Sequence, residues 1–386
     1  MLIDYLPAEF LINGARKNEL EKTMVSDFVL RAIRLVNNSE NAVYITRCAF
    51  ELKTGGKTLH TAVYTGESLE SRLESLVIFA DRFLKKRKGI GEVFRKGNLQ
   101  KTIGTDKFWN HNRLSPTLAL NPGQEIGFMD EHFRIAAEKP VDELVIIVYY
   151  IQDDKEEEAR VNVPVIQYEN RNRYIFPVKG TWLAIGTWDD PVNGHRGAWS
   201  QEFALDLIQL DTNLQSAAKK NEESPCYGKE VVAIADGEVI DCYNAFPENP
   251  APDILMKGEQ LRECAEKHGF IATGSGNFVI LEHAKGESSF YAHFIPGSLQ
   301  VRKGDKVKQG QVLGKVGNSG NSDGPHLHFQ LMDKPSHLTG RGLPCHFVNV
   351  KNIFGKEVQL VDMPSSIVHV TGQEKRLENE PESRVR

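Results

Sequence analysis

The sequence predicts a mainly β protein, in which a β-sandwich-like N-terminal domain with one helix precedes a domain of short antiparallel strands. Two observations support this fold class. Apolar runs rich in Val, Ile, Phe and Tyr recur along most of the chain, separated by Gly, Asn, Asp and Pro. By contrast, we find helical periodicity in only two stretches. The length of 386 residues is more than one compact domain usually holds, so we expect at least two.

Residues 1–171 form the first predicted domain. We expect one helix in it, beginning after Ser68 as N-cap and ending before Gly89, because the apolar residues from Leu69 to Leu84 fall on one helical face. The strand-like runs around this helix read FVLRAIRLV, NAVYITRCAFEL, KTLHTAVYT, GQEIGFM, DELVIIVYYIQ and RVNVPVIQY. No pattern in this domain indicates its role.

Residues 172–362 form the second predicted domain, and residues 363–386 form a C-terminal extension. A short helix is expected at 253–269, ending at Gly269 and inserted between strands. The last sixteen residues, TGQEKRLENEPESRVR, are too polar to bury a surface, so we expect a disordered tail.

The composition excludes several classes of function. A net charge of -5, with 40% hydrophobic and 26% charged residues, is ordinary for a soluble globular protein and does not favour nucleic acid as a partner. The basic run at 85–88 follows a predicted helix end, where positive charge suits the helix dipole. No apolar window is long enough to span a membrane, and no signal peptide is visible, so the sequence as it stands suggests a cytoplasmic protein.

The stretch GPHLHFQL contains the first candidates for chemistry, His326 and His328. Residues two apart in a strand point to the same side, so these two histidines would project together while Phe329 and Leu331 face away into packing. Such a pair is consistent with a metal ligand and a catalytic residue beside it. It is equally consistent with two polar residues on a solvated sheet edge.

Other candidates lie upstream. His293 follows Tyr291 by two positions in SSFYAHF, on the same predicted face, whereas His283 ends a strand and is expected at the surface. Asp206 stands in the apolar run FALDLIQL, where a carboxylate is costly unless it is paired or bound to a metal, and His195 precedes it. A catalytic zinc needs three protein ligands and one open position, and these residues could supply them.

A glycine-rich segment, GSLQVRKGDKVKQGQVLGKVGNSG, predicts short strands joined by tight turns. This pattern also suits a biotinyl or lipoyl carrier domain, which would not be an enzyme. A carrier needs a lysine exposed at a hairpin tip between matched hydrophobic residues. We find no hairpin here that presents one.

Taken together, these segments resemble the lysostaphin-type (LytM-like) zinc metallopeptidases, whose best-known members cut peptide cross-links in bacterial peptidoglycan. The resemblance covers about residues 190–335 and rests on several segments in order, FALDLI, GKEVVAIADGEVI, GNFVILEH, FYAHF, VRKGDKVKQGQVLGKVGNSG and GPHLHFQL. It implies a peptide or peptidoglycan substrate. It also implies action in the cell envelope, although the sequence shows no export signal.

Position by position, the resemblance implies that Asp206 and His328 are zinc ligands, that His326 and His293 are the catalytic histidines, and that each chain binds one Zn²⁺. The family usually places its first ligand, a histidine, four residues before the aspartate, where this chain has Glu202. We favour His195 as the third ligand, because some relatives carry the histidine further upstream of a similar QEFALD segment. Glu202 as an oxygen ligand is the alternative.

The leading hypothesis is therefore a zinc metalloendopeptidase in which a zinc-activated water, assisted by histidines, attacks a peptide bond. The alternative is a catalytically inactive LytM-like module that binds peptidoglycan or a partner protein, and the departure at Glu202 favours it. Geometry separates the two hypotheses. Convergence of His195, Asp206 and His328 favours the enzyme, and convergence of only two of them favours the binding module.

Overall fold

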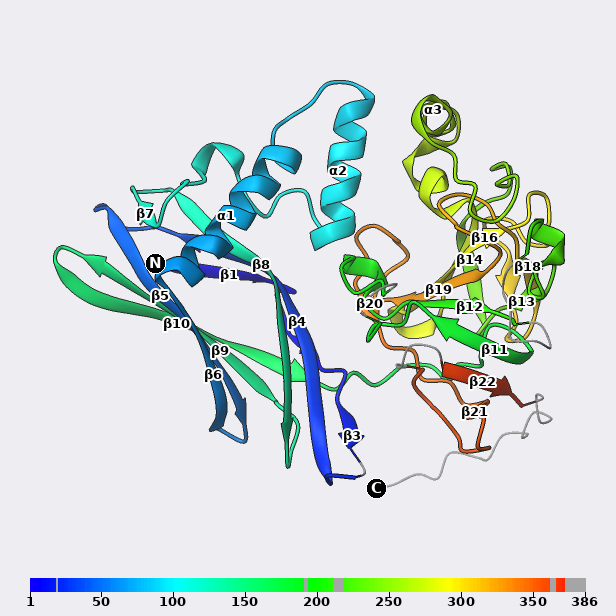
Figure 1. The fold of residues 1–386 in the computed structure, drawn as a ribbon, viewed down its shortest axis with the longest axis horizontal. Coiled ribbons are helices and arrows are strands. Elements are labelled where there is room, and N and C mark those ends of the chain that lie inside the picture. Colours follow the sequence, from blue (N-terminus) through cyan, green and yellow to red (C-terminus); the bar gives the residue numbers. More distant parts are fainter. Residues whose placement is uncertain (19, 191–193, 211–217, 362–365, 372–386) are drawn as a thin grey trace. The chain divides into compact units, whose positions relative to one another are not determined.

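A computed structural model describes residues 1–18, 20–190, 194–210, 218–361 and 366–371, and the chain divides into two compact units (Figure 1). Unit 1 contains Met1–Glu169, Gly197–Ser200 and His337–Leu343, and unit 2 contains Asn170–Arg196, Gln201–Ser336 and the chain from Pro344 onward. Each unit has sheets of its own, and the protein is mainly β, as the sequence predicts. Among the described residues, no helix combines the length and apolar character needed to cross a membrane.

Unit 1 is a β-sandwich. Its strands are β1 (Leu2–Leu6), β2 (Leu11–Ile12), β3 (Arg16–Asn18), β4 (Thr23–Val36), β5 (Val43–Thr54), β6 (Lys57–Thr65), β7 (Ala119–Leu120), β8 (Glu125–Ala137), β9 (Glu143–Gln152) and β10 (Lys155–Ile166). One sheet has the order β1-β4-β3, with β8 also on β4, and the other has the order β2-β10-β9-β5-β6, with β7 on β5. The Phe133 ring of β8 lies 5.4 Å from Phe28 of its own sheet and 5.5 Å from Phe50 of the other, so one core joins both sheets.

Helix α1 (Gly66–Phe83) confirms the predicted helix, with Leu69, Leu73, Leu76 and Ala80 buried. Its N-cap is Thr65 rather than Ser68. Ser68 occupies the third helical position, where its hydroxyl accepts a hydrogen bond from the Thr65 backbone at 2.9 Å. Thr65 and Ser68 together form a capping box, a motif that has one polar side chain at the cap and another at the third position.

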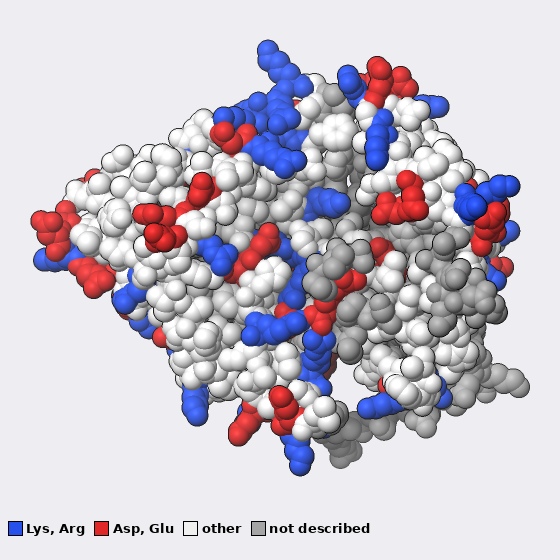
Figure 2. All heavy atoms as spheres, viewed as in Figure 1, with Lys and Arg blue, Asp and Glu red and all other residues white. Residues whose placement is uncertain are grey.

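The sequence prediction missed helix α2 (Ile90–Ile103). Gly89, which we interpreted as a stop, is instead the N-cap of α2, with φ of 57°. The basic residues between the two helices are exposed, and Figure 2 shows Lys and Arg side chains gathered over this connection. Lys85 pairs with Asp81 at 2.7 Å on the last turn of α1, which agrees with a helix-end role for this charge.

Unit 2 is built around one large antiparallel sheet. Its strands are β11 (Gly180–Ile185), β12 (Leu205–Ile208), β14 (Gly237–Tyr243), β15 (Asn277–Glu282), β16 (Ser288–Phe294), β17 (Lys306–Val307), β19 (Leu327–Met332), β21 (Val350–Asn352) and β22 (Ser366–Val370), in the order β17-β14-β15-β16-β19-β12-β11-β22-β21. A separate pair is formed by β13 (Glu230–Val232) and β18 (Val312–Lys315). The remaining short elements of the chain belong to both units. They are β20 (Gly342–Leu343) and the 3₁₀ turns His111–Arg113, Trp199–Gln201, Asn221–Glu223 and Ala284–Gly286.

Two features of unit 2 differ from the predicted boundaries. Helix α3 (Gly258–Ser275) begins later than predicted and is interrupted at Gly269, whose backbone is non-helical with φ of 86°. The predicted stop at Gly269 is thus confirmed, but the helical turns from there to Ser275 were not predicted. Strand β22 lies beyond the predicted domain end at 362 but pairs with β11, so the sheet of unit 2 includes part of the predicted extension. Of the predicted disordered tail, residues 372–386 lie outside the described residues.

Candidate metal centre and catalytic site

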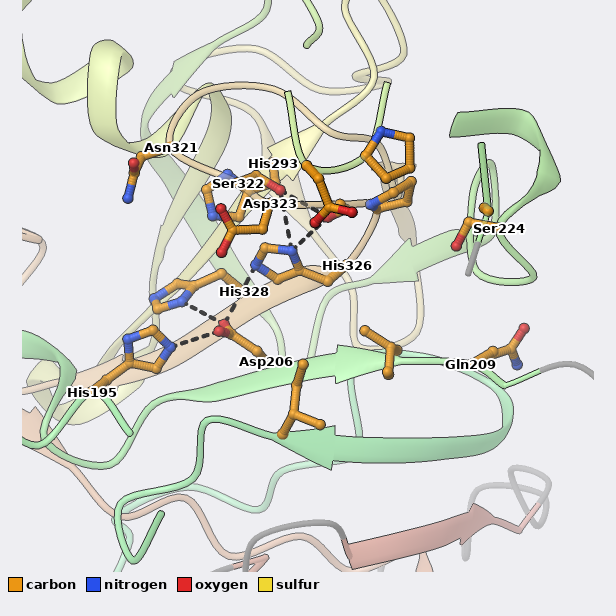
Figure 3. A pocket seen from close by; sticks show the side chains of 17 residues that line it. His195, Asp206, Gln209, Ser224, His293, Asn321, Ser322, Asp323, His326 and His328 are labelled. Atoms are coloured by element: carbon orange, nitrogen blue, oxygen red, sulfur yellow. Dashed lines mark hydrogen bonds and ion pairs between the residues drawn. The ribbon is translucent and has the colours of Figure 1, made fainter. Parts of the chain in front are cut away.

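Three side chains of metal-ligand type converge in unit 2 (Figure 3). Asp206 of β12 lies directly opposite His328 of β19 in the antiparallel register, and its Oδ1 lies 2.9 Å from His328 Nδ1. His195, from the loop that precedes β12, places its Nε2 2.7 Å from Asp206 Oδ2. One ligand atom from each residue falls within 4.8 Å of the others. The structure thus brings together the three predicted ligands, whose roles remain predictions.

The contacts of His328 indicate that this donor set suits a cation. Its Nε2 lies 2.9 Å from Gln330 Oε1, which can only accept, so Nε2 carries the hydrogen. In the neutral ring, Nδ1 then presents a lone pair to a carboxylate oxygen of Asp206. A second proton would resolve that repulsion, but burial lowers the pKa of His328, although Asp206 opposes the shift. A metal ion resolves the repulsion without protonating the ring, so the residues fit one.

Asp206 is held in its charged form. Burial by itself would raise the pKa of this carboxyl group. The positive charge that His326 and His195 carry when protonated, together with the hydrogen bond between His195 and this carboxylate, outweighs burial and holds the pKa well below its usual value. The carboxylate is therefore available as an anionic ligand across the physiological pH range.

His326 and His293 lie beside this centre, with their ring centroids 4.6 Å apart. His326 Nδ1 donates to Gly324 O at 2.8 Å, and His293 Nδ1 donates to Ser319 O at 2.7 Å. Each neutral ring therefore keeps a lone pair on Nε2, which is the nitrogen that can accept a proton. The Nε2 atom of His326 lies 3.6 Å from Asp206 Oδ1, so this nitrogen faces the centre.

The backbone of β16 directs His293 into the site. His293 has φ of 68°, which is unusual for a residue other than glycine, and the pairing of β16 with β15 shifts register at this point. We expected Tyr291 and His293 to share one face, and this expectation is wrong because the irregularity breaks the alternation. Tyr291 is fully buried and its hydroxyl accepts a hydrogen bond from Ile234 N at 3.1 Å. Burial, reinforced by the charges of His326 and His328, holds the pKa of His293 well below its usual value.

Buried asparagines fix the loop at 317–324, which supplies both carbonyl acceptors. Asn249 Nδ2 donates to Gly320 O and to Ser322 O, each at 3.0 Å, and Asn277 Nδ2 donates to Ser319 Oγ at 3.2 Å. The loop also packs closely on the end of α3, because a Cβ atom at Gly320 would lie 2.2 Å from the backbone nitrogen of Gly276. These contacts hold the orientations of His293 and His326 through their acceptors.

The site opens into a pocket of about 610 Å³, lined by His195, Asp206, His293, His326 and His328 among other residues. Asp323 and Asn321 also line it, and its described lining includes no Lys or Arg. Glu202 is buried, with 6% of its surface exposed, and does not belong to the lining. The geometry therefore favours His195 over Glu202 as the third ligand.

One prediction about the neighbouring residues is wrong, and two residues that contact the predicted histidines were not predicted. His283 is not at the surface but 4% exposed, because its Nδ1 donates to Asp236 O at 2.9 Å and its Nε2 accepts from Ser289 Oγ at 2.7 Å. Gln330 and Ser322 contact His328 and His326 and were not predicted. Gln330 could have been found, because it follows His328 by two positions and so shares its strand face.

Comparisons with known proteins agree with the predicted resemblance over part of the chain. The profile of peptidase family M23 matches residues 223–339. This stretch contains His293, His326 and His328, whereas His195 and Asp206 precede it.

Several curated proteins are similar to this chain. The peptidoglycan DD-endopeptidase ShyA of Vibrio cholerae is 40% identical over 58 residues, 15% of this chain and 13% of that protein. An uncharacterized metalloprotease of Haemophilus influenzae is 37% identical over 78 residues, 20% of this chain and 15% of that protein. The DD-carboxypeptidase/endopeptidase Mpg of Neisseria meningitidis serogroup B is 42% identical over 57 residues, 15% of this chain and 13% of that protein. The matches thus span only a small part of each relative.

Among solved structures, the catalytic domain of the antimicrobial peptidase lysostaphin from Staphylococcus simulans is 22% identical, with a TM-score of 0.25, over 42% of this chain and 88% of that chain. The M23 profile matches the segment that carries three of the five predicted site residues. The predicted resemblance to the LytM-like peptidases of family M23 is therefore confirmed for residues 223–339.

Proposed function

We propose that this protein is a zinc-dependent metalloendopeptidase that hydrolyses the peptide cross-links of peptidoglycan. The observation that carries this proposal is the convergence of His195, Asp206 and His328 beside two further histidines in one pocket. Two nitrogens and a carboxylate oxygen are donors that zinc takes in catalytic sites. The names of the relatives support the substrate, because one of them is a peptidoglycan DD-endopeptidase. The proposed substrate places the site of action in the cell envelope.

His195, Asp206 and His328 would hold the metal. Zinc, when bound, supplies a Lewis acid that polarises the scissile carbonyl and lowers the pKa of a bound water to about 7. The donor set leaves one side open, because the same residues line the pocket through which a substrate enters.

His326 and His293 would move the proton. Each presents Nε2 with a free lone pair, since each Nδ1 donates to a backbone carbonyl. One of these nitrogens accepts the proton that the attacking water loses as its oxygen bonds to the carbonyl carbon. The same nitrogen then returns the proton to the amine as the carbon–nitrogen bond breaks. The low pKa of His293 keeps its ring neutral before the reaction.

The metal content of the purified full chain tests the proposal. We expect about one zinc per chain in the wild type and in Glu202→Gln, and loss of zinc in His195→Ala, because the pocket includes His195 and not Glu202. Elemental analysis measures the metal, and release of new amino groups from purified peptidoglycan measures hydrolysis.

Two results would count against the proposal. Retention of zinc in His195→Ala together with its loss in Glu202→Gln would make Glu202 the ligand. A wild-type chain that sediments with peptidoglycan but contains no zinc and releases no amino groups would be the inactive binding module.

A further inference from the structure

One face of β19 carries a chain of polar contacts that ends at the proposed metal ligand. His328, Gln330 and Met332 alternate along the strand and are 4%, 1% and 0% exposed. Because side chains two apart share a strand face, the three lie in a row. Gln330 is therefore a fully buried amide that lies between a histidine and a thioether.

The surroundings of this row are apolar. Met332 packs in a cluster with Phe278, Ile280 and Phe290, and the Phe290 ring lies 6.0 Å from that of His328. A buried polar atom without a partner costs about 1–3 kcal/mol, so each polar atom in the row needs the neighbour that the row provides.

The chemistry of the two neighbours sets the orientation of the Gln330 amide. Its Nε2 donates to Met332 Sδ at 3.0 Å, and its Oε1 lies 2.9 Å from His328 Nε2. A thioether sulfur can accept a hydrogen bond but has no hydrogen to donate. The amide nitrogen therefore faces Met332, and the carbonyl oxygen faces His328.

We propose that Gln330 is a positioning residue that holds His328 as the tautomer with its hydrogen on Nε2, which leaves Nδ1 free to bind the metal. The inference rests on the proposed function, since it concerns the same site. In the opposite tautomer, the hydrogen on Nδ1 would point at Asp206 Oδ1, 2.9 Å away, and would form a hydrogen bond where the metal should bind.

Loss of the Gln330 acceptor favours that competing state. With an apolar side chain at 330, the Nε2 hydrogen of His328 faces the apolar cluster and has no partner. The His328 ring then becomes more stable with its hydrogen on Nδ1, because that hydrogen can be donated to Asp206. Metal binding must break this hydrogen bond, so zinc affinity falls.

The test measures zinc affinity and the tautomer of His328 separately, on the full chain. We expect Gln330→Leu to bind zinc about 10–100-fold more weakly than the wild type in competition with a chelator, as is usual when the partner of a ligating histidine is removed. In the metal-free protein, ¹⁵N NMR should place the hydrogen on Nε2 in the wild type and on Nδ1 in Gln330→Leu. A merely structural role would not move this hydrogen.

Two further variants keep the test decisive if Gln330→Leu does not fold. Gln330→Glu retains an acceptor for His328, so we expect the Nε2 tautomer and an affinity equal to or tighter than that of the wild type. Met332→Leu removes the acceptor that orients the amide, so we expect a loss of affinity smaller than that of Gln330→Leu.

The outcomes separate this inference from the proposed function. If the wild type binds zinc and Gln330→Leu binds it equally well with an unchanged tautomer, Gln330 is not a positioning residue and the enzyme proposal is unaffected. If Gln330→Glu loses both the Nε2 tautomer and zinc affinity, the inference also fails. If the wild type binds no zinc, the proposed function fails, and the tautomers in the metal-free variants still decide whether Gln330 positions His328.

Discussion

Both units bury carboxylates, but they neutralise them in different ways. In unit 1, Glu131 is 2% exposed and lies 3.1 Å from Arg72 Nη1, and Asp27 accepts a hydrogen bond from Arg134 Nε at 2.6 Å. In unit 2, the charged and hydrogen-bonding partners that the structure gives Asp206 are histidines. An arginine is a permanent cation, so these two carboxylates of unit 1 are already paired with a positive charge. A histidine is charged only while it is protonated, so the Asp206 site can exchange that charge for a metal ion.

The contrast between Glu131 and Asp206 therefore lies in whether the partners of the carboxylate are permanently charged. Among the described residues, the group of metal-ligand type lies around Asp206.

Removing either histidine of the GPHLHF segment should abolish most activity, but for different reasons. We expect His326→Ala to keep zinc and lose about 10²–10⁴-fold in kcat, the usual contribution of a general acid–base group. We expect His328→Ala to lose zinc as well, because His328 contacts Asp206 directly. Zinc content and peptidoglycan hydrolysis, measured on the same preparations, separate the two effects. Loss of zinc in His326→Ala would make His326 a ligand instead.

A matched change in unit 1 should affect stability and not chemistry. Arg72→Met removes this cation from the buried Glu131 and leaves the hydrogen bond from the Tyr64 hydroxyl at 2.9 Å. We expect the free energy of unfolding to fall by about 1–3 kcal/mol, less than for a fully buried pair because Arg72 is partly exposed. Urea denaturation measures this change, while zinc content should stay the same.

The double variant Arg72→Met/Glu131→Met provides the control. Replacing both partners by apolar groups leaves no orphaned charge, so part of the lost stability should return. If the double variant is less stable than Arg72→Met, Glu131 has a role in unit 1 beyond its pairing with arginine.

The sequence predicted those parts of the fold and site that depend on local pattern. The alternation of apolar residues located the long strands, and the apolar stripe located α1. In both cases the spacing of the apolar residues shows which face of the element is buried. It could not predict α2, whose start at Gly89 is also a valid helix stop. In the site, the spacing of His326 and His328 was visible. The choice between His195 and Glu202 as third ligand could not be settled from spacing, because His195 reaches Asp206 through a loop whose path is set by tertiary packing.

Irregular backbone also limited what could be predicted from the sequence. Alternation predicted that Tyr291 and His293 share a face, but the positive φ of His293 sends it into the pocket while Tyr291 stays in the core. Such an irregularity arises from cross-strand contacts that no local pattern encodes. Likewise, the burial of His283 depends on contacts with Asp236, which precedes β14, and with Ser289 of β16, and its own strand pattern does not reveal them.

The smallest predicted effect concerns His283, a buried histidine of unit 2 that lies away from the Asp206 site. Burial lowers its pKa, although the carbonyl of Asp236 and the charge of Glu287 oppose the shift. A histidine whose pKa is lower in the folded state takes up its proton first in the unfolded state, so stability is unaffected well above pH 6.5 and falls as the pH drops below it. The slope from one such group is at most about 1.4 kcal/mol per pH unit.

We therefore expect the free energy of unfolding of the wild type to fall between pH 6.5 and pH 5, with His293 and His328 adding in the same direction because their pKa values are also lowered. His283→Gln should show a shallower fall over the same range, measured by urea denaturation in metal-free buffer. Asp206 does not interfere, because its pKa lies below this window. Equal slopes in the two proteins would mean that His283 binds its proton equally in the folded and unfolded states, so that burial in unit 2 does not by itself keep a histidine neutral.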